Sequence, residues 1–498
     1  MQAGGNFVSL PFDFTMKKIL EKYEPIIGLE IHTQLSTASK AYSSDGTTYG
    51  AMPNTQTNAI SLGHPGTLPM PNATVYEFAV RLGLACSCQI RERNEYARKN
   101  YFYADLPKGY QITQDTTPIC TGGFVDIEDA NGDPKRIGLT RIHMEEDSGK
   151  SIHDIDPFNT LIDLNRAGTP LLEIVSEPDF RTGQEAYNYL SEMRKLVRYL
   201  EISDGNMEEG SLRCDVNVSI RPIGREKFGT KVEVKNMNSF RNVQRAIDYE
   251  IKRQYELYEN NEEVHQQTRT FDAAKGKTIL LRAKEDAHDY RYFPEPDIQP
   301  VSVKQDYINS VKAELPPLPS ELLAKYLGLG LSEYDAKLLT ESKDIALYFE
   351  AIIGHTKNHK QAANWLMGSI KSYLNEKAVA IKDFPLSAKT IAELIALVDA
   401  GTVSNSAANG DLFKALLEQP NTSPKQLAQE LNLMQESDSD ALLELVQSVL
   451  QKYPAKVAEY QGGKKGLMGL FMGEVMKLSK GKADPKVTTK LVQQELEK

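Results

Sequence analysis

The sequence predicts an α+β protein: an N-terminal domain with an antiparallel sheet covered by helices on one face, followed by an all-helical part. Between Tyr23 and about Pro300, short runs alternate apolar and polar residues and are separated by Gly, Pro and Asn, as in antiparallel sheets. After the Pro-rich hinge 316–323, helical spacing replaces this alternation. A chain of 498 residues exceeds one hydrophobic core. We expect an N-terminal extension over 1–22, a cradle domain over 23–315, a helical domain over 316–425 and a helical tail domain over 426–498.

Composition is ordinary for a globular protein, with 40% hydrophobic and 25% charged residues. No run of about 18 apolar residues occurs and the N-terminus lacks a signal-peptide pattern, so we expect a cytoplasmic protein without membrane contact. The four cysteines are too few for a disulfide framework, and the Cys86/Cys88 pair has no second pair at zinc-site spacing. The net charge of -10 disfavours nucleic acid for the whole chain, although single domains can differ.

The first strand is expected over Ile26–Leu35, where apolar and polar side chains alternate. Its apolar side carries Ile27, Leu29, Ile31 and Leu35, and its polar side carries Gly28, Glu30, His32 and Gln34. Glu30 and His32 therefore point the same way and can share a ligand. Taken alone, the stretch is explained equally well by a polar strand face in contact with solvent.

A hairpin is expected from Ser211 to Lys235. Its first strand alternates Leu212, Cys214, Val216, Val218 and Ile220 with Arg213, Asp215, Asn217, Ser219 and Arg221, and its second alternates Val232 and Val234 with Lys231, Glu233 and Lys235. Cys214 lies on the apolar side, which indicates packing rather than nucleophilic chemistry.

Two further segments add acidic residues. The segment Arg141–Ser151 contains His143, Glu145, Glu146 and Asp147, and the segment Asp163–Asp179 places Glu173 among aliphatic residues. Burying a carboxylate is costly unless it is paired or bound to a metal, so Glu173 requires a partner.

Two amphipathic helices are expected to cover the apolar face of the sheet. Thr182 with Glu185 predicts a capping box that starts the first, and the second is expected to begin near Asn238 or Ser239. Their apolar stripes suit packing on the sheet better than ligand binding.

The polar face of the predicted sheet gathers carboxylates. It collects Glu30, His32, Glu145, Glu146, Glu173, Asp215 and Glu233. Crowded carboxylates repel one another unless a cation lies among them, and hard oxygen ligands favour Mg2+ or Mn2+. Metal binding is the favoured interpretation, with a salt-bridged polar face as the alternative. His32 is an unusual ligand for Mg2+, which leaves Mn2+ and a ligand-orienting role open.

Several catalytic classes do not fit the sequence. Gly149-Lys150-Ser151 matches the end of a P-loop, but Met144 stands where its first glycine is required. No G-x-S-x-G elbow and no Cys/His pair supports acyl-enzyme chemistry. A metal with acids, lysines and arginines on an open sheet suits phosphoryl transfer, where catalysis is mainly positioning and charge neutralisation. From the residues alone, the interpretation stops at a metal-dependent site that suits a nucleotide. Its candidate nucleotide or substrate contacts are Lys99, Arg141, Arg166, Arg213, Asp215, Lys231 and Lys235.

Seven ordered motifs carry a resemblance to a known family. They are IIGLEIHTQL (26–35), KNYFYADLPKGYQITQ (99–114), RIHMEEDSGK (141–150), DLNRAGTPLLEIVSEPDFRT (163–182), MEEGSLRCDVNVSIRP (207–222), EVKNMNSF (233–240) and DYRYFPEPD (289–297). Together they resemble the B subunit of the aspartyl/glutamyl-tRNA(Asn/Gln) amidotransferase, the GatB family, over nearly the whole chain.

The resemblance implies an activity and partners. Such subunits use ATP to phosphorylate the side-chain carboxylate of glutamate or aspartate misacylated onto tRNA(Gln) or tRNA(Asn), and ammonia then displaces the phosphate. An amidase-type A subunit supplies the ammonia from glutamine, and a small C subunit helps hold the complex together. The implied Mg2+-dependent kinase site matches Glu30, His32, Glu145, Glu146, Glu173 and Glu233, with catalytic roles for Glu30, His32, Glu146, Glu173 and Glu233. A complete zinc-binding cysteine set, present in some relatives, is not matched.

The C-terminal tail reverses the charge of the chain. Residues 456–498 contain nine lysines and five acidic residues, a local charge of +4. Lys464, Lys465, Lys477 and Lys480 suit contact with a phosphate backbone, and the resemblance implies tRNA as the partner. Met468, Met472 and Met476 form a helical stripe, and Gly466, Gly469 and Gly473 favour close packing against another helix.

A tRNA-binding adaptor with a structural acidic cluster is the alternative to an ATP-dependent enzyme subunit.

Overall fold

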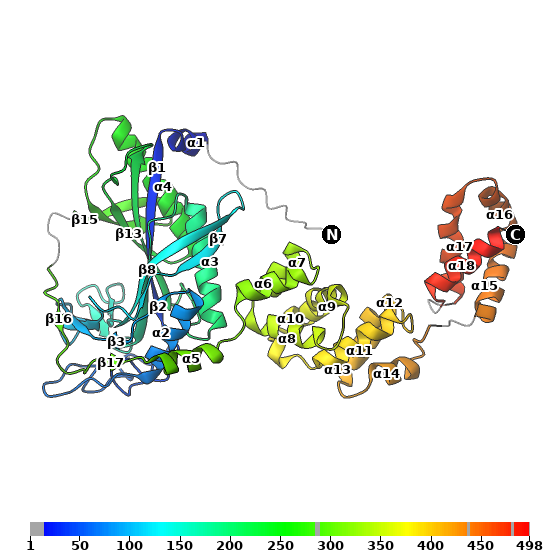
Figure 1. Ribbon diagram of the computed structural model, residues 1–498, viewed down its shortest axis with the longest axis horizontal. Coiled ribbons are helices and arrows are strands. Elements are labelled where there is room, and N and C mark those ends of the chain that lie inside the picture. Colours follow the sequence, from blue (N-terminus) through cyan, green and yellow to red (C-terminus); the bar gives the residue numbers. More distant parts are fainter. Residues whose placement is uncertain (1–13, 284–288, 436–438, 480–482, 498) are drawn as a thin grey trace. The chain divides into compact units, whose positions relative to one another are not determined.

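The computed structural model describes residues 14–283, 289–435, 439–479 and 483–497 (Figure 1). The chain divides into two compact units, Met1–Leu318 and Pro319–Lys498. All described strands belong to the first unit, and the second is helical, so the predicted α+β class is confirmed. The boundaries expected within each unit stay a prediction. Among the described helices, none has the length and apolar character needed to cross a membrane.

The main sheet of the first unit has ten strands, in the order β15-β14-β13-β12-β1-β11-β8-β6-β2 with β7 paired to β8. Their bounds are β1 (Tyr23–Gln34), β2 (Gln89–Ile90), β6 (Cys120–Thr121), β7 (Phe124–Glu128), β8 (Pro134–Glu146), β11 (Pro170–Ser176), β12 (Leu212–Pro222), β13 (Val232–Met237), β14 (Gln267–Asp272) and β15 (Lys277–Ala283). Neighbouring strands are antiparallel except β13 and β14, which run parallel because a helix connects them. The expected antiparallel sheet is therefore mixed.

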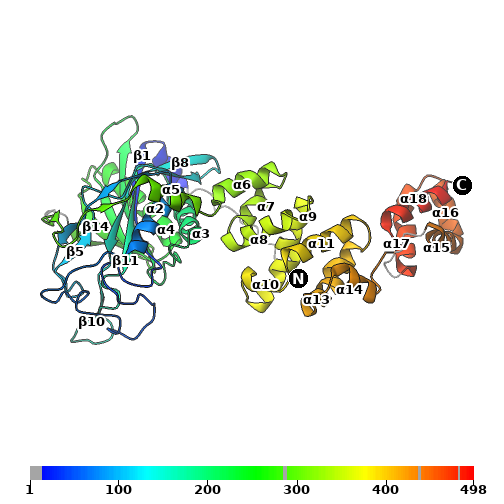
Figure 2. The ribbon, with the colours of Figure 1, turned by 60° about the horizontal axis from the view of Figure 1, so that its bottom comes forward.

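Smaller elements surround this sheet. The remaining strand groups are β9 (Lys150–Ile152) with β10 (Leu161–Asp163), β16 (Phe293–Pro294) with β4 (Ala97–Asn100) and β5 (Tyr110–Thr113), and β17 (Val301–Ser302) with β3 (Arg93–Asn94). The helices of the first unit are α1 (Phe14–Leu20), α2 (Ala73–Ala85), α3 (Gly183–Tyr199), α4 (Phe240–Glu259) and α5 (Gln305–Ala313). The long connection between β1 and α2 lies beside β10 (Figure 2), where Asn54 Nδ2 donates to the Ile162 carbonyl at 2.9 Å.

The apolar face of the main sheet forms the core, with β1 in its middle. Ile27, Leu29 and Ile31 are at most 2% exposed, whereas Glu30 and His32 on the other side of β1 are only partly buried. Helices α3 and α4 pack against each other, and α4 packs against β12 and β13 (Figure 1). The expected alternation of β1 is confirmed, and it leaves a polar face for chemistry.

Both predicted helix starts are confirmed. The Thr182 hydroxyl accepts from the Glu185 amide at the start of α3, and the Ser239 hydroxyl accepts from the Asn242 amide at the start of α4. The capping box of α3 is shifted by one residue, because the Glu185 carboxylate accepts from the Arg181 amide at 2.7 Å. Each cap satisfies a backbone donor that a helix leaves unpaired.

The cysteines of the first unit are packing residues. Cys86, Cys120 and Cys214 are buried, and no disulfide joins the four described cysteines. Burial raises the pKa of these three thiols. None of them has the lowered pKa of a reactive thiolate.

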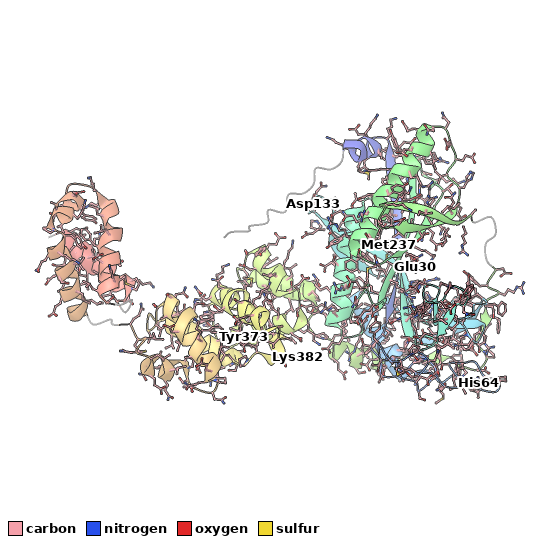
Figure 3. All side chains as sticks on the ribbon, turned by 180° about the vertical axis from the view of Figure 1, so that it is seen from behind. Glu30, His64, Asp133, Met237, Tyr373 and Lys382 are labelled. Carbon is pink, nitrogen blue, oxygen red and sulfur yellow. The ribbon has the colours of Figure 1, made fainter. Side chains whose placement is uncertain are left out.

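The predicted hairpin of β12 and β13 is confirmed, with one irregularity. On either side of Asp215, β12 pairs with Val234 and with Met237, so Lys235 and Asn236 together face a single residue. This is a β-bulge, and Asn236 has the left-handed φ of 65° that such a bulge often requires. The extra residue brings Met237 opposite Cys214 on the core side of the sheet, where it is 5% exposed. Met237 and Glu30 of the first unit are labelled in Figure 3.

The second unit consists of short helices. They are α6 (Pro319–Gly328), α7 (Glu333–Leu339), α8 (Lys343–Ile353), α9 (His359–Trp365), α10 (Lys371–Lys377), α11 (Ala388–Asp399), α12 (Asn405–Ala407), α13 (Phe413–Glu418), α14 (Pro424–Glu430), α15 (Ser439–Lys452), α16 (Pro454–Gln461), α17 (Met468–Leu478) and α18 (Pro485–Leu496). Two π-helical segments follow α9 and α12 directly, at Leu366–Ile370 and Ala408–Leu412. Trp365 is buried beside Phe413, with ring centroids 5.5 Å apart.

The last helices form a cluster of their own. Leu442 and Val446 of α15 pack with Phe471 and Val475 of α17, and the predicted methionine stripe faces this core. The glycines of this segment do not pack as expected: a Cβ added at Gly469 or Gly473 of α17, or at Gly466 shortly before α17, would meet no described atom within 4 Å outside its own turn of helix. The reason is that α17 uses its methionine side for packing, which leaves the glycine side exposed.

Candidate active site

Three strands place ionisable side chains in one row on the polar face. His32 of β1 lies opposite Glu173 of β11, which in turn lies opposite His143 of β8. Opposed residues of antiparallel strands project to the same side, so the three side chains are neighbours. Glu173 Oε2 is 3.3 Å from His32 Nε2 and 3.5 Å from His143 Nε2. One carboxylate therefore lies between two imidazoles.

Glu30 and Glu145 complete this group, which we call the acidic cluster. Each lies two residues along its strand from a histidine and so projects to the same face. His32 Nε2 is 3.8 Å from Glu30 Oε1 and 3.5 Å from Glu145 Oε1. His143 Nε2 is 3.7 Å from Glu145 Oε2. Within the described residues, ligand atoms lie within 4.8 Å of one another in two groups, Glu30 with His32 and Glu173, and His143 with Glu145 and Glu173.

Burial and charge act in opposite directions in the acidic cluster. Burial disfavours the charged form of Glu173, but His143 and His32 outweigh it and lower the pKa of this carboxyl to about 2. Burial also disfavours the charged form of His32, but Glu173, Glu145 and Glu30 raise its pKa to about 9. The pKa of Glu30 is raised, first by burial and then by repulsion from Glu173. The carboxylates of the cluster therefore stabilise a positive charge placed among them, such as that of protonated His32.

His143 is the member of the cluster that was not selected from the sequence. Its side chain is 4% exposed, and its buried Nδ1 has no hydrogen-bond partner among the described residues. A signal was present, because His143 stands two residues before Glu145 and shares its face of the strand. The decisive fact is its register opposite Glu173, which the sequence does not reveal.

Glu146, a predicted metal ligand and catalytic residue, points away from the acidic cluster. It directly follows Glu145 on β8, and successive side chains of a strand project to opposite faces. Its carboxylate contacts Lys108 and accepts from the Ile112 amide at 2.9 Å. The structure therefore places Glu146 in an ion pair with Lys108, and the hydrogen bond from Ile112 joins β8 to β5.

Glu233 also lies apart from the cluster, because β12 separates β13 from β1. Its carboxylate accepts from Thr268 Oγ1 at 2.8 Å and pairs with Lys235 Nζ at 3.1 Å. Lys235 also contacts Asp215, which lies opposite Glu30. Of these predicted site residues, Asp215 and Lys235 border the cluster, and Glu233 reaches it through Lys235.

The arginines Arg213 and Arg166 are held by Asp147, a buried carboxylate that directly follows β8. Asp147 Oδ2 is 3.0 Å from Arg213 Nη2, 3.6 Å from Arg166 Nε and 2.8 Å from Gln34 Nε2. Burial favours the neutral acid, but both guanidinium groups outweigh it and hold the pKa of Asp147 below its usual value. Asp147 was one of the acidic residues of the segment 141–151, but no role was predicted for it. The structure shows that its carboxylate binds two of the predicted contacts, Arg213 and Arg166.

The other positively charged residues predicted for the site lie at different distances from the acidic cluster. Arg141 Nη2 is 3.9 Å from Glu173 Oε1, at the edge of the cluster. Lys99 Nζ lies 5.0 Å from the centre of the Tyr290 ring; burial opposes its charge, but nearby carboxylates, Glu145 foremost, raise its pKa. Lys231 is exposed before β13 begins.

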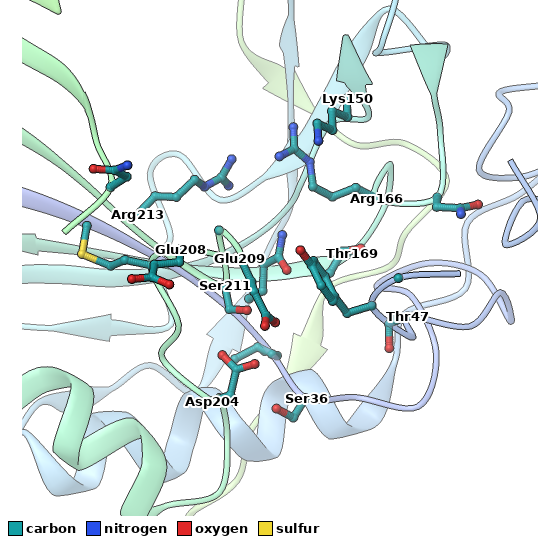
Figure 4. Close-up of a pocket in the computed structure, with 18 of the residues that line it drawn as sticks. Ser36, Thr47, Lys150, Arg166, Thr169, Asp204, Glu208, Glu209, Ser211 and Arg213 are labelled. Atoms are coloured by element: carbon teal, nitrogen blue, oxygen red, sulfur yellow. The ribbon is translucent and has the colours of Figure 1, made fainter. Parts of the chain in front are cut away.

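Two adjoining clefts open on this face. The smaller, of about 330 Å3, is lined by Glu30, His32, Glu145, Lys99, Arg213 and Lys235 among others. The larger, of about 760 Å3, lies between the segments 47–51, 163–169 and 204–211. In Figure 4, Lys150, Arg166 and Arg213 lie in the upper part of the larger cleft, above Asp204, Glu208 and Glu209. Arg213, Asp215 and Asn236 line both clefts, so they mark the junction between them.

The donor set of the acidic cluster fits a divalent metal ion. Its three carboxylates offer the oxygen ligands that Mg2+ and Mn2+ prefer, and its two imidazoles are more usual for Mn2+. Glu173, shared by both groups of ligand atoms, has a pKa of about 2 and is ionised at neutral pH, as a ligand must be.

Comparisons with known proteins identify the family. Residues 25–309 match the family model of the GatB/GatE catalytic domain, and residues 347–496 match that of the GatB domain. Similar proteins, each named as the B subunit of aspartyl/glutamyl-tRNA(Asn/Gln) amidotransferase, occur in Trichodesmium erythraeum (48% identical over 97% of this chain and 99% of the relative), Persephonella marina (46%, over 95% and 99%) and Thermosynechococcus vestitus (49%, over 95% and 96%). The resemblance in the motifs is confirmed, and the chain belongs to the GatB family.

Proposed function

We propose that this chain is the ATP-using subunit of a tRNA-dependent amidotransferase. It phosphorylates the side-chain carboxylate of Glu-tRNA(Gln), Asp-tRNA(Asn) or both, and ammonia from an amidase-type A subunit then displaces the phosphate, with a small C subunit in the complex. The observation that carries the proposal is the row of His32, Glu173 and His143 beside a cleft that also contains lysine and arginine. Relatives of nearly equal length bear the name of such a subunit.

The residues of the chain contribute binding, positioning and charge. Glu30, His32, His143, Glu145 and Glu173 would hold Mg2+ or Mn2+ in the acidic cluster. Such an ion, when bound, neutralises charge on the transferring phosphoryl group. Lys99, Arg213 and Lys235 line the same cleft and supply positive charge for the phosphates of ATP. The adjoining larger cleft has room for the parts of ATP and of the misacylated tRNA that the smaller cleft does not hold.

Metal-dependent ATP turnover by the complete complex tests this proposal. The chain, combined with its A and C subunits, glutamine and a misacylated tRNA, should release phosphate from ATP only when Mg2+ or Mn2+ is present. Gln-tRNA(Gln) is the control, because its side chain has no carboxylate to phosphorylate. Absence of ATP turnover with both misacylated tRNAs would leave the tRNA-binding adaptor, whose acidic cluster is structural.

We also propose that the tail domain, residues 426–498, binds the tRNA backbone. Lys464, Lys465 and Lys477 are exposed, and Lys480 lies outside the described residues. Replacing all four lysines by Gln in one variant should weaken tRNA binding and reduce the slope of log affinity against log salt, by roughly one unit for each phosphate that is no longer neutralised.

Truncation after about Glu430 should likewise weaken binding while the cradle stays folded. Unchanged tRNA affinity in the truncated complex would contradict a binding tail.

A further inference from the structure

We propose that a polar pocket of the second unit, which we call the amide pocket, binds one unstacked base of the tRNA. The pocket has a volume of about 350 Å3 and is lined by Gln361, Asn364, Trp365, Asn405, Ser406 and Asn409. The inference rests on the proposed function only where it takes tRNA as the partner. It adds a contact with a base to the phosphate contacts of the tail lysines.

The residues that line the amide pocket are uncharged. Four of them carry an amide, one a hydroxyl and one an indole, so the pocket offers hydrogen-bond donors and acceptors but no full charge. The side-chain polar groups of Gln361, Asn364 and Ser406 have no hydrogen-bond partner among the described residues. These groups are therefore available to a ligand that is itself uncharged and carries both donors and acceptors.

Two π-helical turns frame the pocket. The turn Leu366–Ile370 directly follows Trp365, and the turn Ala408–Leu412 contains Asn409. Ser369 Oγ of the first turn donates to Asn409 Oδ1 of the second at 2.8 Å, so the two turns are held together. π-Helical turns are rare and often occur at functional sites. The two that the structure describes both adjoin this pocket.

Trp365 closes the inner end of the pocket. It is 3% exposed and lies against Phe413, with ring centroids 5.5 Å apart. Asn364 and Ser406, in contrast, are exposed. The pocket therefore has an aromatic floor held by packing and a rim of polar side chains that a ligand can reach.

An unstacked base has the properties that this pocket requires. It is flat and uncharged, and its edges carry both donors and acceptors. Proteins recognise single-stranded RNA through aromatic contacts and hydrogen bonds to such edges. Pockets for small ligands measure roughly 300–1,000 Å3, so the amide pocket suits one base with its sugar. A phosphate group or a metal ion would find no charged partner among the lining residues.

Two observations favour tRNA as the source of the base. Residues 347–496 match one family domain, so the pocket and the exposed tail lysines belong to the same domain. The segment 351–375, which contains Trp365, has three lysines and no acidic residue. Of these lysines, Lys357 and Lys371 are exposed and can contact phosphates near a bound base.

Two variants change the pocket, and a third is the matched control. Asn364→Leu removes an amide at nearly constant volume, and Ser406→Phe places a ring in the pocket. Both positions are exposed and their side chains have no hydrogen-bond partner among the described residues, so the fold should persist. Asn375→Leu is the control, because Asn375 is an exposed asparagine of α10 that does not line the pocket. All variants are made in the full chain.

The affinity for tRNA and its salt dependence separate a base contact from a phosphate contact. Asn364→Leu and Ser406→Phe should each weaken tRNA binding by the complete complex about tenfold, whereas Asn375→Leu should bind like wild type. The slope of log affinity against log salt should stay unchanged, since no phosphate contact is lost. Weaker binding with a lower slope would make the pocket a phosphate site and overturn the proposal.

Chemical probing of the tRNA identifies the base. At saturating tRNA, one base that the wild-type complex protects from dimethyl sulfate or carbodiimide should regain its reactivity in Asn364→Leu and Ser406→Phe. Asn375→Leu should keep it protected. If both pocket variants protect the same bases as wild type, the amide pocket does not bind a base.

Trp365 provides a further readout in the full chain by itself, because it is the only tryptophan of the chain. Saturating tRNA should change its fluorescence in wild type and Asn375→Leu, but not in the two pocket variants. Unchanged fluorescence in wild type, with no base made reactive in the variants, overturns the proposal. A wild-type complex without ATP turnover refutes the proposed phosphorylation instead, and the binding, probing and fluorescence results still decide whether the pocket binds a base.

Discussion

Glu173→Gln is expected to lower ATP-dependent phosphorylation of misacylated tRNA by about 100-fold to 1,000-fold, while glutamine hydrolysis by the partner A subunit survives. Glu173 Oε2 is within 3.5 Å of both imidazoles, and its carboxylate belongs to both groups of ligand atoms. Glutamine keeps the volume of the side chain but removes its negative charge. Phosphate release from ATP and glutamate release from glutamine, measured on one preparation, separate the two reactions.

The variant should stay folded, because Glu30 and Glu145 remain to balance the imidazoles. Its Mn2+ affinity should fall as well, which titration calorimetry detects without any turnover. Glu24→Gln is the matched control, since Glu24 lies near the start of the same strand as His32 and pairs there with Arg181 at 2.8 Å. Full transamidation by Glu173→Gln, with unchanged metal dependence, would make Glu173 a structural acid.

Asp147→Ala is expected to lower the free energy of unfolding of the first unit by about 3–5 kcal/mol, because it leaves Arg213 and Arg166 without their shared carboxylate. The Asp147 side chain is 4% exposed, so water replaces it poorly. Its folded-state pKa lies below the unfolded-state value of about 3.9, so its stabilising effect is present at neutral pH and is lost as pH falls below that value. The difference between variant and wild type should therefore shrink in acid.

Hydrogen exchange in β1 and β8 is the suitable measurement for this prediction. The single tryptophan, Trp365, lies in the second unit, so its fluorescence does not report on the first. Asp126→Ala is the control: Asp126 pairs with Arg136 at 2.8 Å, but its side chain is 57% exposed, and such a surface pair contributes at most about 1 kcal/mol. Equal losses of unfolding free energy in the two variants would contradict the prediction. They would show that water hydrates Arg213 and Arg166 when Asp147 is absent.

Much of the site could be predicted because the alternation of apolar and polar residues along a strand shows which side chains share a face. The polar side of β1 and the hairpin of β12 and β13 follow from a period of two residues, and they correctly place Glu30, His32 and Asp215 on one face. Alternation alone also assigns Glu145 and Glu146 to opposite faces, yet the density of acids in that segment suggested that both were ligands. Strand period was the more reliable guide there.

Register and crossover could not be predicted, because they depend on pairings between distant segments. The sequence does not show that His143 lies opposite Glu173, and this pairing brings in the second imidazole. It also does not show that α4 returns the chain for a parallel β14, which lies beyond Glu233. In the tail, the exposed glycines of α17 followed from which side of the helix the methionines occupy.

The central place of β1 has a consequence for biosynthesis. Both neighbours of β1, the strands β11 and β12, are translated long after it, and the Leu29 amide donates to Ser176 Oγ across 147 residues of chain. Such long-range pairing is slow to form. Glu30 and His32 therefore leave the ribosome well before Glu173 and Asp215 exist. A nascent chain that ends before β12 has no complete acidic cluster, and the open edges of its first strand are available to other strands, so it depends on protection from aggregation until β12 emerges.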